Sequence, residues 1–126
     1  MGNHLERTYY EYISGVPVIH VGGDLKSENP EQMRRLADLA EELAKKKVKA
    51  AVVDFQSVGL ISSSQLGQVA LAYDMLYDNG AEVYLCNTKD EKGYPYKVLK
   101  IIGITDFPGV HVNETIDEAV AALSQQ

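Results

Sequence analysis

The sequence has very little of what marks disulfide-bonded, nucleic-acid-binding or membrane-inserted proteins. Cys86 is the only cysteine among 126 residues, so no internal disulfide can form. The chain has 12 basic and 18 acidic residues, and its net charge of −6 argues against nucleic acid, whose binders need a basic face. No apolar run reaches the length of a membrane span, and no signal peptide opens the chain. We therefore expect a cytoplasmic protein that neither inserts into a membrane nor binds nucleic acid.

The sequence also lacks the patterns of metal, nucleotide and hydrolytic sites. Its histidines, cysteine and carboxylates have no metal-ligand spacing, and Gly22-Gly23 does not open the glycine-rich motif of dinucleotide sites. The Ser62–Ser64 run lacks both glycines of a hydrolase nucleophile elbow, and no ordering signal surrounds His4, His20 or His111. We expect no cofactor, no metal and no enzymatic activity.

What the chain does have is the composition of one globular domain. Hydrophobic residues make up 45% and charged residues 24% of the sequence, which is enough to bury a core without a disulfide or a metal. There is no internal repeat, low-complexity segment or linker, so we expect a single domain over residues 1–126. Cys86 lies in the apolar run Val83–Cys86 and is expected to be a small buried core residue.

The order of the predicted elements indicates an α/β fold. Two strand-like runs, Thr8–Ile13 and Val16–Val21, flank Ser14-Gly15, which is a two-residue hairpin signal. Downstream, short β-branched runs alternate with stretches of 3.6-residue apolar period. We predict strands at Val48–Asp54, Glu82–Cys86 and Val110–Val112, and helices from Pro30 to the Lys45–Lys47 run and over Ser63–Asn79, Pro95–Ile102 and Thr115–Leu123. Strands joined through helices are parallel, so we expect a mixed β-sheet, an antiparallel hairpin followed by parallel strands, with about four helices.

Three serines, Ser62, Ser63 and Ser64, stand between the strand at Val48–Asp54 and the apolar stripe of the next helix. This spacing delivers them to the first turn of that helix. A helix N-terminus offers unpaired N–H groups and the positive end of the helix dipole, which together stabilise an anion. The segment is therefore a candidate switch controlled by serine phosphorylation; alternatively, the serines only cap the helix.

The order and spacing of several motifs resemble a STAS domain, the module shared by anti-sigma factor antagonists and the cytoplasmic tails of sulphate transporters. The resemblance covers nearly the whole chain. It rests on Val21–Leu25, Val53–Val58, Ile61–Gly67, Gly80–Leu85, Ile101–Ile104 and Thr115–Leu123. It implies a single STAS-like α/β domain that regulates other proteins by binding them.

In the bacterial antagonists that the chain resembles, a kinase-like anti-sigma factor phosphorylates the serine directly after a motif aspartate. By position this serine is Ser63, with Ser62 and Ser64 as secondary candidates. Ser62 stands where the family keeps the aspartate, and Gln65 stands where it keeps a glycine. Loss of the carboxylate removes an acceptor that could orient the serine hydroxyl, and Gln65 adds a side chain to a surface that the family keeps bare.

The resemblance also implies a surface that binds a partner. Its expected members are Asp24, Leu25, Ser62, Ser63, Ser64 and Gln65. The expected partner is a kinase-like anti-sigma factor, which phosphorylation of Ser63 would release by placing negative charge in the contact. The alternative is a STAS-like subunit of a transport complex, or a scaffold of a signalling assembly, that binds without phosphorylation. The serine at position 62 favours this alternative.

Asp54 and a tyrosine-rich strand are the remaining candidates. Asp54 ends a strand, as the phosphoacceptor of a receiver domain does, but the acidic pair that receivers carry after the first strand is missing. We expect Asp54 to hydrogen-bond the loop backbone near the helix start instead. Strand alternation puts Tyr10 and Tyr12 on one face and Tyr9 on the other, which suits either a half-buried strand or an aromatic contact surface.

Overall fold

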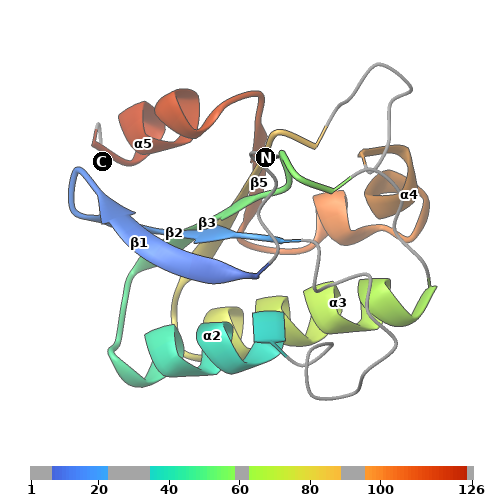
Figure 1. The fold of residues 1–126 in the computed structure, drawn as a ribbon, viewed down its shortest axis with the longest axis horizontal. Helices are drawn as coiled ribbons and strands as arrows, with labels where there is room; N and C mark the ends of the chain where they lie inside the picture. The colour runs from blue at the N-terminus through green and yellow to red at the C-terminus, as the bar shows by residue number, and fades with distance from the viewer. Residues whose placement is uncertain (1–6, 23–34, 59–62, 89–95, 125–126) are drawn as a thin grey trace.

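The protein is built on a mixed β-sheet whose strands lie side by side in the order of the chain (Figure 1). This computed structural model describes residues 7–22, 35–58, 63–88 and 96–124. The strands are β1 (Tyr9–Ile13), β2 (Val16–His20), β3 (Ala50–Asp54), β4 (Glu82–Cys86) and β5 (Val110–Asn113). β1 and β2 are antiparallel, and every later pair of neighbours is parallel. The predicted α/β fold, with a hairpin first and parallel strands after it, is confirmed.

The turn between β1 and β2 explains why these two strands pair antiparallel. Ser14 and Gly15 both have positive φ angles, 52° and 81°, as a type I′ hairpin turn requires. The resulting register places Tyr9 directly opposite His20. The hairpin signal that the sequence showed at Ser14-Gly15 is therefore confirmed.

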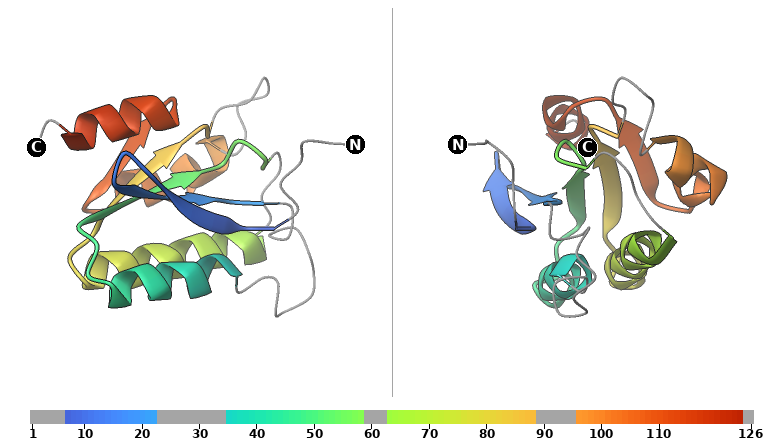
Figure 2. Two further views of the ribbon diagram at one scale, coloured as in Figure 1. Left: turned by 60° about the vertical axis from the view of Figure 1, so that its left-hand side comes forward. Right: turned by 45° about the vertical axis from the view of Figure 1, so that its right-hand side comes forward.

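Helices cover both faces of the sheet. α2 (Arg35–Lys45) and α3 (Ser63–Asp78) pack side by side on one face, and α5 (Ile116–Ser124) lies on the other (Figures 1 and 2). Between β4 and β5 the chain forms α4 (Tyr96–Ile101) and a 3₁₀ helix, η2 (Ile104–Asp106). The four predicted helices are present among the described residues, and η2 is an element that the sequence did not predict. None of the helices in the described part of the chain is long and apolar enough to cross a membrane.

Alternate residues along the strands enter two separate apolar clusters. On the side of α2 and α3, Ile19, Val53 and Leu85 are buried in the larger cluster. On the side of α5, Val18 and Val52 are buried in the smaller one. Because both faces are covered, the parallel strands are apolar along most of their length. The stripe that predicted the first helix is buried as expected, at Leu36, Leu39, Ala40 and Leu43.

The ends of the elements mostly follow local signals in the sequence. Thr115 Oγ1 accepts the Glu118 N–H at 3.1 Å, as the predicted capping motif requires. The third strand, however, begins at Ala50 rather than at Val48. Val48 still donates its N–H to a carbonyl in the last turn of α2, so it belongs to the exit from that helix. The predicted helix start at Pro30 lies outside the described residues.

Candidate functional site

The predicted switch lies where the chain passes from β3 to α3. α3 begins at Ser63, so Ser63, Ser64 and Gln65 belong to its first turn. The side chains of these three residues are not among those that the structure describes. Also outside the described residues are the other members of the predicted surface, Asp24, Leu25 and Ser62. The docking surface therefore stays a prediction at these positions, and the geometry around it comes from the neighbouring residues.

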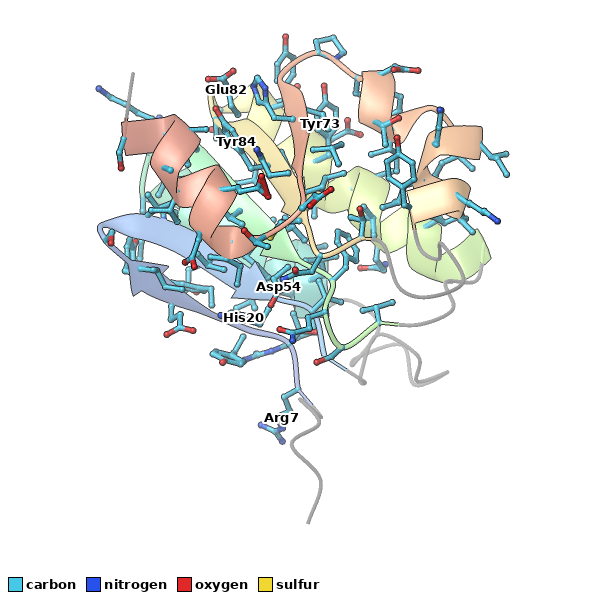
Figure 3. The ribbon with its side chains drawn as sticks, turned by 90° about the horizontal axis from the view of Figure 1, so that it is seen from above. Arg7, His20, Asp54, Tyr73, Glu82 and Tyr84 are labelled. Carbon is cyan, nitrogen blue, oxygen red and sulfur yellow. The ribbon has the colours of Figure 1, made fainter. Side chains whose placement is uncertain are left out.

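A partly buried polar network lies at the carboxyl ends of β2 and β3, before this turn (Figure 3). His20 ends β2 and Asp54 ends β3, and the parallel register places the two residues side by side. His20 Nδ1 is 2.7 Å from Asp54 Oδ2, and His20 Nε2 is 2.6 Å from Glu11 Oε2 on β1. Asn87, which follows β4, donates from Nδ2 to Asp54 Oδ1 at 2.7 Å. We name Glu11, His20, Asp54 and Asn87 the cross-sheet network.

His20 lies between two carboxylates, so the expectation that nothing orders it is wrong. Only 7% of the residue is exposed, and the Tyr9 ring stacks on the imidazole with 4.9 Å between ring centroids. Each ring nitrogen of His20 lies within hydrogen-bond distance of a carboxylate oxygen. Neither nitrogen is free to take a proton from a nucleophile. The position of His20 therefore suits a residue that links β1, β2 and β3 better than it suits the base of a hydrolase.

Asp54 is buried, with 2% of the residue exposed, yet donors surround its carboxylate. Oδ1 accepts the backbone N–H of Gln56 at 3.0 Å as well as the Asn87 amide, and Oδ2 accepts from His20. A carboxylate at this depth is tolerated only when it is paired and hydrogen-bonded. The Gln56 contact confirms the prediction that Asp54 binds loop backbone near the helix start. Asp54 thereby joins the sheet to the turn that precedes α3.

Local sequence patterns could not reveal this network, because its members are far apart in the chain. The contacts of His20 span 9 residues to Glu11 and 34 residues to Asp54. One usable signal was present: a polar residue ends each of the apolar runs that form β2 and β3. The carboxyl ends of parallel strands meet at one edge of a sheet. Two such polar ends on neighbouring strands therefore predict a contact.

Burial near the network suppresses the ionisation of its neighbours. Burial raises the pKa of the Cys86 thiol from its ordinary 9.0 to about 12, and the Asp54 charge contributes after it. The Cys86 Sγ lies 3.7 Å from the Val53 carbonyl oxygen. Burial likewise raises the pKa of Tyr9, with Glu11 and then Asp54 as further causes. Cys86 is thus the buried core residue that the sequence predicted, held as a neutral thiol rather than a nucleophile.

The tyrosines of β1 divide between two faces, as strand alternation predicts. The Tyr10 and Tyr12 rings meet edge to face with 6.0 Å between centroids. Tyr10 packs against the larger core cluster, and its hydroxyl accepts from Lys46 Nζ at 2.7 Å. Tyr9 lies on the opposite face against His20. The half-buried interpretation of this strand is confirmed, and the aromatic contact surface stays a prediction for the exposed Tyr12.

The described residues contain no group of three or more histidine, cysteine or acidic side chains that could hold a metal ion. His111 does have a partner, because its Nε2 lies 2.8 Å from Glu82 Oε1 on the neighbouring strand. Both side chains of this pair are about two-fifths exposed, at 42% and 41%. A single histidine–carboxylate pair supplies too few ligands for a protein zinc site.

The outer face of α3 is uncharged over the half of the helix that begins at the predicted switch. No charged residue occurs from Ser63 to Tyr73, and Gly67 and Leu71 are exposed one turn apart. A Cβ atom built on Gly67 would meet no atom within 4 Å. In contrast, charged residues occupy the exposed positions of α2: Arg35, Asp38, Glu41, Glu42 and Lys45. We use the name α3 surface for the exposed positions Gly67 and Leu71 together with the helix backbone around them.

Comparisons with known protein families and with solved structures agree with each other. The family model described as STAS domain matches residues 10–119. An anti-sigma-factor antagonist (STAS) domain protein from Planctomyces limnophilus has a TM-score of 0.69 at 15% identity, covering 94% of this chain and 98% of that protein. For an anti-sigma factor antagonist from Mycobacterium paratuberculosis the TM-score is 0.67 at 22% identity, with 93% and 92% covered. The phosphorylated form of SpoIIAA, a Bacillus cell fate determinant, gives 0.60 at 20% identity, with 92% and 98% covered.

At such low identities, the structural neighbours establish a common fold and nothing finer. No curated protein matches the chain in sequence. The site must therefore be interpreted from its own geometry. An uncharged α3 surface follows a turn that a partly buried polar network holds in place.

Proposed function

Because the chain belongs to the STAS domain family, we propose that it is a regulatory protein-binding module of the anti-sigma factor antagonist kind. It acts in the cytoplasm as a single domain over residues 1–126, without catalysing a reaction. Its partner is a kinase-like anti-sigma factor. The contact consists of the α3 surface together with Asp24, Leu25 and the turn Ser62–Gln65.

The observation that carries this proposal is the α3 surface. Leu71 is 41% exposed, and covering it with a partner would bury apolar area worth on the order of 1 kcal/mol. Gly67 has no side chain, so a partner can approach the helix backbone closely there. No charged side chain has to be stripped of water from Ser63 to Tyr73. A helix that presents such a face to solvent is suited to contact another protein.

Phosphorylation of Ser63 switches the contact off. A phosphoserine carries about two negative charges at neutral pH, and the N-terminus of α3 stabilises such an anion in the free chain. In the complex the same charge would enter an uncharged contact and would have to be desolvated. Phosphorylation therefore releases the partner without unfolding the domain. SpoIIAA, whose fold this chain shares, is itself known in a phosphorylated form.

The second candidate is a constitutive subunit of a transport complex, or a scaffold of a signalling assembly. The observation that favours it is Ser62, which stands where the resembling antagonists keep an aspartate. Without that carboxylate, one acceptor that could orient the Ser63 hydroxyl is lost. In this second role the same α3 surface binds a partner permanently.

The test combines the purified chain, Mg-ATP and a purified kinase-like ATPase of the anti-sigma factor type from the same organism. Mass spectrometry then locates the phosphate, and titration calorimetry measures the affinity of each variant. We expect phosphate on Ser63, an affinity for Ser63→Ala close to that of the wild type, and binding by Ser63→Asp that is about tenfold weaker or worse.

The outcomes separate the two functions. A chain that binds but stays unmodified at all three serines contradicts the phosphorylation switch and supports the constitutive subunit. Equal effects of the Ala and Asp variants show that the serine serves only as a helix cap. A chain that does not bind the ATPase contradicts the antagonist function itself.

A further inference from the structure

We infer that His20 is a positioning residue for the docking surface: through Asp54 it fixes the turn that leads into α3, and through Glu11 it links that turn to the outer strand of the sheet. The use of this turn in docking rests on the proposed function. The way in which the turn is held rests on the described contacts alone.

The turn after β3 takes its shape from Asp54. Asp54 Oδ1 accepts the N–H of Gln56, two residues further on, at 3.0 Å. The Val58 N–H bonds back to the Phe55 carbonyl at 2.9 Å. An aspartate side chain used in this way replaces a backbone partner and stabilises the turn. α3 begins soon afterwards, at Ser63, so this turn lies shortly before the start of the helix.

Side chains from both neighbouring strands hold the Asp54 carboxylate in the required orientation. His20 donates to Oδ2 and Asn87 donates to Oδ1. Asn87 is itself fixed, because its φ angle is 54° and its N–H bonds to the Glu114 carbonyl at 3.0 Å. Removing the His20 donor would leave Oδ2 buried without a partner. The carboxylate would then rotate or draw in water, and Gln56 would lose its acceptor.

The other end of the network reaches solvent on β1. The Glu11 side chain is 47% exposed, against 9% for the His20 side chain. The bond from Nε2 to Glu11 sets the rotation of the ring, so that Nδ1 faces Asp54. Among the described residues, the titratable groups packed around the imidazole are Glu11 and Tyr9 from β1 and Asp54 from β3. Arg7 lies apart from them (Figure 3). The exposed carboxylate of β1 is therefore connected to the turn by a continuous chain of contacts.

The two hydrogen bonds of the His20 ring can be tested one at a time, because some substitutions of His20 keep one bond and remove the other. In His20→Asn, the amide nitrogen takes the place of Nδ1 and keeps the donor to Asp54. In His20→Gln, the longer side chain carries its amide toward the position of Nε2 and keeps the donor to Glu11. His20→Leu removes both donors while remaining bulky. If His20 acts through Asp54, the Asn variant rescues the turn and the Gln variant does not.

The test is native-state hydrogen exchange of the free chain, monitored by NMR at individual backbone amides. We expect exchange at Gln56 to rise about tenfold in His20→Gln and His20→Leu, and by less than about threefold in His20→Asn. The comparison amide is Val83 on β4, which bonds to the Gly109 carbonyl on the far side of the sheet. Removing a donor of the buried carboxylate also lowers global stability and so raises exchange at Val83. The ratio of exchange at Gln56 to exchange at Val83 is therefore the readout, and it should be about tenfold higher in His20→Gln than in His20→Asn.

An equal rise at Gln56 and Val83 would show that His20 only stabilises the whole fold, and would overturn the positioning role. The same conclusion follows if Gln56 is unaffected by His20→Leu. Titration of the ATPase partner then shows whether the turn matters for docking, with the Gln and Leu variants bound about tenfold more weakly than the Asn variant. Because exchange is measured without a partner, failure of the wild type to bind would contradict the proposed function while leaving the exchange result valid.

Discussion

His20 Nδ1 lies 2.7 Å from Asp54 Oδ2, in the interior at the ends of two adjacent parallel strands. A carboxylate at such depth is stable only when its polar atoms, and those of the groups it binds, also find partners. Glu11, the Gln56 N–H and the Asn87 amide supply these partners. The contact joins the outer hairpin of the sheet to the turn that precedes α3.

Asp54→Asn should lower the free energy of unfolding by about 3 kcal/mol, the scale expected when one partner of a buried charge pair is removed. The amide has nearly the size of the carboxylate, but one acceptor becomes a donor that faces other N–H groups. The His20 ring also loses one of its two carboxylate partners. Urea denaturation followed by circular dichroism measures the loss.

The pair of His111 and Glu82 is the matched control for Asp54→Asn. It also joins an imidazole and a carboxylate, at 2.8 Å, but both of its side chains are well exposed. Glu82→Gln should cost less than about 1 kcal/mol, since exposed ion pairs contribute little. If Glu82→Gln and Asp54→Asn lowered the free energy of unfolding by similar amounts, the claim that burial makes the His20–Asp54 contact important for stability would be contradicted.

Cys86 should resist alkylation in the folded protein. The thiolate is the reactive species, and burial raises the pKa of this thiol to about 12. Iodoacetamide should modify the native chain at least about 100-fold more slowly than the urea-unfolded chain, because reaction requires opening of the core. Equal rates in the two states would show that the thiol is accessible.

The raised pKa of Cys86 also predicts how stability changes at alkaline pH. The unfolded thiol ionises near its ordinary pKa of 9.0, whereas the folded thiol keeps its proton up to about 12. The unfolded state therefore binds fewer protons in this window, and the free energy of unfolding falls as the pH rises through it. Below pH 9 the contribution is fully present. Wild type should lose stability more steeply than Cys86→Ala across this window, and parallel curves would contradict the shift.

Two glycines should respond in opposite ways to replacement by alanine. Gly67 lies inside α3 with open space beside it, so Gly67→Ala should raise stability by about 1 kcal/mol through helix propensity. At Gly22 a Cβ would lie 2.5 Å from the carbonyl carbon of Arg7. Gly22→Ala forces a backbone shift and should cost about 2 kcal/mol. Thermal denaturation of both variants checks the signs, and a loss for Gly67→Ala would show that the site is not open.

The fold was predictable because its signals are local. Ser14-Gly15 specifies the hairpin, the apolar runs specify strands covered on both faces, and Thr115 caps the last helix through the Glu118 N–H. The start of the third strand was wrong by two residues because Val48 still bonds to the end of α2. Local sequence patterns therefore predict which helices and strands form, but they predict the first and last residues of these elements less accurately.

The polar network was not predictable in the same way. The position of Asp54 at a strand end and its bond to loop backbone followed from its local sequence, but its pairing with His20 depends on the register between β2 and β3. The bond from His20 to Glu11 further depends on the antiparallel hairpin. Register is a property of the assembled sheet, so such contacts emerge only when strands separated in the chain are placed side by side.

Docking through the α3 surface is tested most directly by the affinity of Leu71→Asp for the kinase-like ATPase, measured by titration calorimetry. The new charge would have to be desolvated in the middle of the contact, so the affinity should fall at least about tenfold. Ala121→Asp, at an exposed position of α5 across the sheet, is the control and should bind like the wild type. A folded Leu71→Asp variant that binds as tightly as the wild type would contradict docking through this face.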